Sequence, residues 1–71
     1  MPYPMGYAVK LDSPGGGVQY VGYAKPGTAS AAASWAIMKI TTSGANLVIT
    51  WDSGDSVMSH VWDNRAGDSY S

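Results

Sequence analysis

The stretch WAIMKITTSGANLVITW, residues 35–51, decides the fold of this chain. Its flanks, 35–41 and 46–51, are rich in β-branched and aromatic residues, and the polar linker between them contains Gly44. This pattern predicts a β-hairpin whose loop of about four residues spans 42–45. Apolar side chains alternate onto both faces of each flank, so we expect the hairpin to be covered on both sides, by its own chain or by neighbouring molecules.

The segment upstream of this hairpin predicts one more strand and a turn. Val18–Ala24 is rich in β-branched and aromatic residues, which favours a strand. Lys25-Pro26-Gly27 follows, and Pro then Gly at successive positions is typical of a type II turn. Residues 28–34 have the highest helix propensity, but so short a segment does not hold an isolated helix, and we expect one helical turn or an irregular loop.

Residues 1–17 are expected to form an extended N-terminal arm, and 18–71 a single small β domain. Prolines at positions 2, 4 and 14 remove amide donors, and three glycines at 15–17 give a flexible break. Within the arm, 5–11 alternates as a short strand would. Such a strand either adds to the sheet of a partner or pairs with 18–24 in a local hairpin. We favour the hairpin.

The C-terminal part of the sequence is less regular. Asp52-Ser53-Gly54-Asp55 predicts a turn, and the polar segment 63–71 a tail that Tyr70 anchors. Residues 57–62 fit a strand and also fit a helical stripe, because the segment is too short for its periodicity to decide. The predicted fold class is therefore mainly β: a small antiparallel sheet or sandwich with a central hairpin and at most a short helical turn.

The composition indicates a chain that needs neighbours. It has 71 residues, no Cys and one His, which excludes disulfides, zinc–thiolate sites and His-rich metal sites. Domains of this size gain only about 3–5 kcal/mol from a single core and usually add a cross-link, a metal or oligomerisation. We therefore expect a homo-oligomer, or docking onto a larger assembly.

Other partner classes are not expected. No apolar run is long enough to span a bilayer, and the first residues lack the basic and apolar regions of a signal peptide. With four Lys and Arg and a net charge of −1, the chain has no basic stripe for phosphates. We expect no nucleic-acid, membrane or cofactor binding.

Two possible chemical sites are considered and set aside. The carboxylates of Asp52 and Asp55 are close in sequence, but a calcium loop needs further oxygen ligands at fixed offsets. His60 lies near Ser56, Ser59 and Asp63, but no nucleophile-elbow motif is present and so small a chain encloses little substrate. We expect a protein that is not an enzyme.

Aromatic residues and the single Arg are the candidates for protein contacts. Arg65 follows Trp62 closely, and its guanidinium can stack on the indole or pair with a carboxylate of this chain or a partner. Most Trp and Tyr residues are expected in the core, the alternative being a platform that stacks on sugars. The predicted interaction residues are Tyr3, Tyr7, Trp62, Arg65 and Tyr70.

Several short motifs occur in a fixed order across residues 20–71. They are YVGYA (20–24), PGTA (26–29), SAAA (30–33), WAI (35–37), KI (39–40), ITWD (49–52) with Gly54, and VWDNRA (61–66). In order and spacing they resemble a group of short proteins encoded by tailed bacteriophages, which are described as virion structural proteins. The position of Met58 is more often aromatic in that group, and residues 1–17 lie outside the match.

The resemblance implies a component of the virion. The expected role is a small oligomeric protein that decorates or cements the capsid, with itself and a major capsid or tail protein as partners. A tail or tail-fibre protein and a module that binds a host glycan or receptor are the alternatives. A stand-alone chain of this length suits decoration slightly better, because fibres are usually long chains.

Overall fold

An antiparallel sheet is the frame of the molecule. A computed structural model describes residues 6–71, and in it four strands pair in the order β1-β2-β3-β4, with β5 paired to β3 off this path. The elements are β1 (Ala8–Gly15), β2 (Val18–Ala24), β3 (Ala33–Ser43), β4 (Asn46–Trp51), β5 (His60–Val61) and the 3₁₀ helix η1 (Trp62–Asn64). The mainly β prediction is confirmed. No helix in residues 6–71 is long and apolar enough to cross a membrane.

The predicted central hairpin is formed by β3 and β4. Ser43 pairs with Asn46, so only Gly44 and Ala45 connect the strands, and the loop is shorter than predicted. Gly44 has a φ of +61°, which suits the first central position of a type II′ turn, the tight connection that matches strand twist.

Residues 8–15 belong to the sheet and do not form a separate arm. β1 pairs with β2 from Ala8↔Ala24 to Gly15↔Val18, which is the local hairpin that the sequence favoured. Gly16 and Gly17, both with positive φ, make its turn. A register shift between Asp12 and Gly15 marks a bulge just before that turn.

Turn chemistry fixes the remaining connections. The Thr28 amide donates to the Lys25 carbonyl and Gly27 has a φ of +86°, as the predicted type II turn requires. The predicted turn at 52–55 is also present, closed by the Asp55 amide on the Asp52 carbonyl. The segment 57–62 follows neither prediction throughout, because His60 and Val61 are a short strand and Trp62 begins the 3₁₀ helix.

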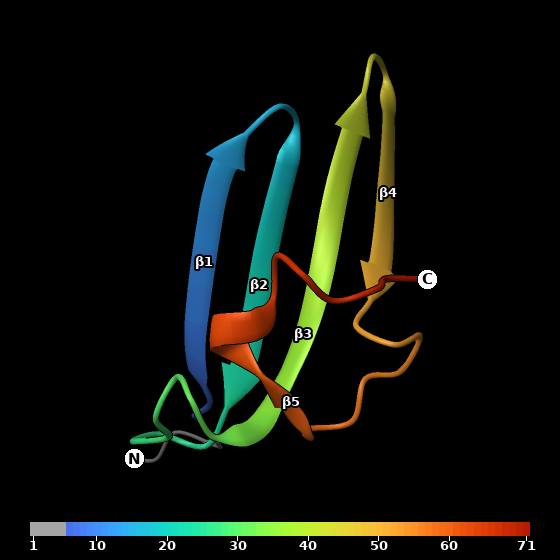
Figure 1. The fold of residues 1–71 in the computed structure, drawn as a ribbon. Helices are drawn as coiled ribbons and strands as arrows, with labels where there is room; N and C mark the ends of the chain where they lie inside the picture. The colour runs from blue at the N-terminus through green and yellow to red at the C-terminus, as the bar shows by residue number, and fades with distance from the viewer. Residues whose placement is uncertain (1–5) are drawn as a thin grey trace.

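The C-terminal segment crosses one face of the sheet. Figure 1 shows β5 and η1, in orange, lying in front of β2 and β3 before the chain turns back towards β4. The end of the chain is held there by Trp51 and Ser71, whose amides each donate to the other's carbonyl. We call the face under this segment the covered face.

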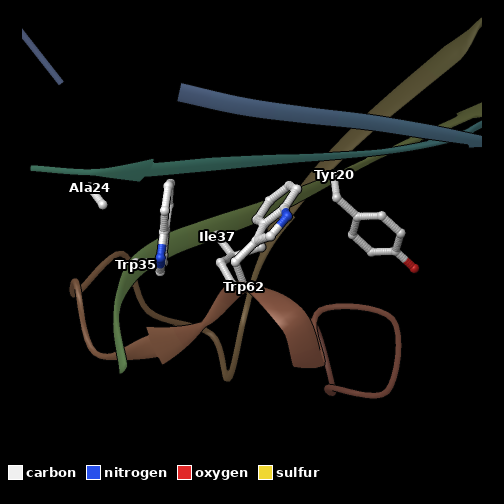
Figure 2. Close-up of a cluster of buried hydrophobic side chains, with 5 residues drawn as sticks. All are labelled: Tyr20, Ala24, Trp35, Ile37 and Trp62. Atoms are coloured by element: carbon white, nitrogen blue, oxygen red, sulfur yellow. The ribbon is translucent and has the colours of Figure 1, made fainter. Parts of the chain in front are cut away.

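The core lies between the covered face and the C-terminal segment. The side chains of Tyr20, Ala24, Trp35 and Ile37 project from β2 and β3, and that of Trp62 projects from η1 towards the sheet (Figure 2). The rings of Trp35 and Trp62 lie 6.0 Å apart between their centroids. A Cβ on Gly22 would stand 2.5 Å from the Trp62 ring, so only glycine lets this indole approach the strand.

Candidate interaction surface

Strand register divides the side chains of the sheet between two faces. Gly22 pairs with Ile37, and both lie on the covered face, so the residues that alternate with them point to the other side. We call that side the open face. From β1 to β4 it carries Val9, Leu11, Val21, Tyr23, Ala36, Met38, Ile40, Leu47, Ile49 and Trp51.

The open face is uncharged and mainly apolar, with the polar residues Gln19 on β2 and Thr42 on β3. One cross-strand row runs through all four strands as Leu11↔Val21↔Met38↔Trp51. Val21 is only 7% exposed, because its neighbours in the row surround it. On the outer strands, Leu11 is 64% and Ile49 52% exposed, since nothing in residues 6–71 lies over them. An exposed apolar patch of this kind usually marks a site of protein association.

The charged residues of the four strands are all on the covered face. Lys10 pairs with Gly22, and both Asp12 and Lys39 pair with Tyr20. No charged side chain of β1–β4 therefore interrupts the open face. A surface without charge has no means to select a charged partner and does not repel a second apolar surface.

On the covered face, charged groups tie the C-terminal segment down. Arg65 donates from Nε and Nη2 to Asp12 Oδ2, at 3.0 and 2.9 Å, and from Nη1 to the Trp62 carbonyl. Its guanidinium carbon also lies 4.5 Å from the centre of the Trp62 ring. Lys10 and Lys39 lie over the rings of Trp35 and Tyr70. Arg65, Lys10 and Lys39 therefore all have partners within their own chain.

The histidine belongs to a structural carboxylate cluster. His60 Nε2 lies 2.9 Å from Asp55 and Nδ1 3.6 Å from Asp52, which connects β5 to the turn at 52–55. Asp52 is 1% exposed, and its Oδ2 has no hydrogen-bond partner among residues 6–71. Burial raises the pKa of Asp52 to about 6, and the nearby Asp68 carboxylate adds to this. A bond to His60 lowers the pKa of Asp55.

The structure places the predicted interaction residues in different surroundings. Tyr7, just before β1, is 54% exposed, whereas Trp62 is a core residue at 6% and not a surface contact. Arg65 is bound to Asp12, and the Tyr70 hydroxyl donates to the Arg65 carbonyl, so Tyr70 anchors the tail of its own chain. Tyr3 lies outside the described residues.

Sequence analysis missed the most exposed apolar residues. Val9, Leu11, Leu47 and Ile49 lie in segments that the sequence predicts as strands, but none is among the predicted interaction residues. The signal was the apolar alternation on both sides of 35–51, which already required two covers. In residues 6–71, β5 and η1 lie over one face only, so the second cover that this alternation required is missing from the described chain.

The hollows of the molecule are smaller than usual ligand pockets, so a small-molecule site is less well supported than an interaction surface. One hollow of about 190 Å³ lies beside the β1–β2 turn, and another of about 280 Å³ is lined by Lys25, Thr28, Ser34 and Met58. Ligand pockets usually enclose about 300–1,000 Å³. The open face is therefore the stronger candidate site.

Comparison with protein families, with curated proteins and with solved structures found no match.

Proposed function

We propose that this protein is a non-enzymatic structural subunit of a tailed bacteriophage particle, which decorates or cements the capsid and uses the open face for assembly. The single observation that supports an assembly role is the uncharged apolar surface across β1–β4. The resemblance along residues 20–71 supports the phage particle as the assembly.

The physical argument for assembly starts from exposure. Leu47 is 62% and Val9 58% exposed, so the outer strands β1 and β4 present apolar side chains that residues 6–71 do not cover. Each such side chain contributes roughly 1.5–3 kcal/mol when it is fully removed from water. A high-copy particle supplies the missing cover, because a subunit packed among neighbours gains stability from binding.

The test compares two substitutions at adjacent positions of β4. Ile49 lies on the open face and Val48 on the opposite side, and they are 52% and 53% exposed. The phage that carries the gene is grown with the wild type, Ile49→Lys or Val48→Lys, and purified particles are assayed for the subunit. We expect wild type and Val48→Lys in the particles and Ile49→Lys lost from them.

Absence of the wild-type protein from purified particles would overturn the proposal. Imaging of the particles then tests the placement. Copies at lattice positions of the shell support decoration, and copies that follow the symmetry of the tail reject the capsid role.

A further inference from the structure

We infer that the occupant of the open face is a second copy of this chain, packed sheet against sheet so that β1 of one copy lies over β4 of the other. This inference rests on the proposed function only in taking the open face as an assembly surface. It adds the identity of the partner and the arrangement of the strands.

The first reason is the shape of the partner that the open face requires. A flat four-stranded face is best filled by another sheet, which packs about 10 Å away with its strands within about 30°. The chain itself supplies such a sheet. A standard interface covers about 800 Å² on each partner, which is under a fifth of the 4331 Å² surface of this chain.

The second reason is charge. Two copies related by a two-fold axis bring the same surface together, so any charge on it would be buried twice in an otherwise apolar interface. The strand residues Lys10, Asp12 and Lys39 all avoid the open face. The surface therefore carries no strand charge whose burial would oppose an isologous contact.

The third reason is the distribution of side-chain bulk. In the row across the sheet, Met38 and Trp51 occupy β3 and β4, while Leu11 and Val21 occupy β1 and β2. A two-fold axis parallel to the strands places Trp51 opposite the partner's Leu11 and Met38 opposite the partner's Val21. Large then faces small along the whole row, as dense packing requires.

The association state of the purified full chain tests this. Sedimentation velocity at tens of micromolar should give twice the 7.4 kDa mass of the monomer for the wild type and for Val48→Lys. Ile49→Lys should weaken association by at least about thirtyfold, as expected when a charge is buried in an apolar interface. Near-UV circular dichroism of Trp35 and Trp62 checks that each variant is folded.

A charge-swap experiment tests the strand arrangement. Leu11→Asp and Ile49→Lys should each be monomeric alone and form a heterodimer when mixed, because Leu11 and Ile49 lie over each other's strands. A mixture of Leu47→Asp with Ile49→Lys, both on β4, should remain monomeric. Heterodimers of this second pair only would overturn the arrangement.

The result separates the inference from the proposed function. A monomeric wild type, with Ile49→Lys still lost from particles, overturns the second copy and leaves another virion protein as the occupant. A dimer that is absent from particles supports the inference and overturns the proposed function.

Discussion

The covered face and the open face of this sheet differ in how far their apolar side chains are shielded from water. The covered face has Trp35 and Ile37 beneath β5 and η1, with charged groups closing the edges. The open face carries aliphatic side chains and no strand charge, and its outer residues are more than half exposed. The contrast shows how a short chain divides its apolar residues. One set is buried within the chain, and the other stays exposed on the outer strands.

The largest expected difference comes from the same substitution on the two faces. Ile37→Ala, at a fully buried position, should lower the free energy of unfolding by about 2–5 kcal/mol. Ile49→Ala, at 52% exposure, should change it by about 0.5 kcal/mol or less when measured on the monomer at high dilution. Urea titrations followed by tryptophan fluorescence provide both values. Equal losses would show that the two faces are not energetically distinct.

The free energy of unfolding should depend on pH through Asp52, which lies on the side of the covered face. Its pKa is raised to about 6, from 3.8, so the folded state binds the proton more tightly than the unfolded chain. Protonated Asp52 therefore stabilises the folded state. This stabilisation is fully present below the pKa of the unfolded chain and is lost as the pH rises from about 4 through 6. It contributes up to about 3 kcal/mol to the free energy of unfolding.

Asp52→Asn provides the control for this pH dependence. The amide does not titrate, so the decrease in unfolding free energy between pH 4 and pH 7 should become shallower in the variant. His60 and Asp68 face Asp52, and Asp55 is bound to His60; all three are kept in the variant. Parallel curves for the two proteins would rule out Asp52 as the source.

Gly22→Ala tests how tightly the covered face is packed. The added Cβ would lie 2.5 Å from one Trp62 ring atom and 3.1 Å from Trp35, so the core must shift. We expect a loss of about 1–3 kcal/mol. Gly6→Ala is the matched control, because nothing lies within 4 Å of its new Cβ. A loss no greater than that of the control would mean that the indoles move freely.

Local chemistry in the sequence was enough to predict most strands and turns. The β3–β4 hairpin depends on Gly44 and its apolar flanks, and the turn at Lys25 on Pro26 and Gly27. The boundary predicted for an arm at 1–17 was less accurate, because residues 8–15 pair with β2 around the turn at Gly16 and Gly17, in the hairpin that the sequence favoured. The anchoring role of Tyr70 was predicted, and its partner, the Arg65 carbonyl, was not.

The sequence could not predict which face of the sheet is covered, and the reason is physical. Alternation shows which residues of 35–51 share a side, but both sides are apolar, and the cover comes from a segment that crosses far along the chain. Arg65 and Asp12, for example, are 53 positions apart. Their pairing depends on η1 lying across β2, which no local pattern specifies.

Salt should weaken the charged contacts of the covered face and not the apolar contacts of the open face, and this is the smallest of the expected effects. The Arg65–Asp12 pair is partly exposed, with side chains 24% and 34% accessible, so we expect Arg65→Lys to cost about 1 kcal/mol or less. Lysine keeps the charge but loses the two-donor geometry on Asp12 and the stacking on Trp62. A double-mutant cycle of Arg65→Gln with Asp12→Asn, which removes both charges, gives the coupling energy, and this should decrease towards zero in 1 M NaCl because ions screen a partly exposed pair. Association through the uncharged open face should not weaken under the same conditions. If the coupling is independent of salt while the dimer dissociates, the assignment of charged contacts to one face and apolar contacts to the other is wrong.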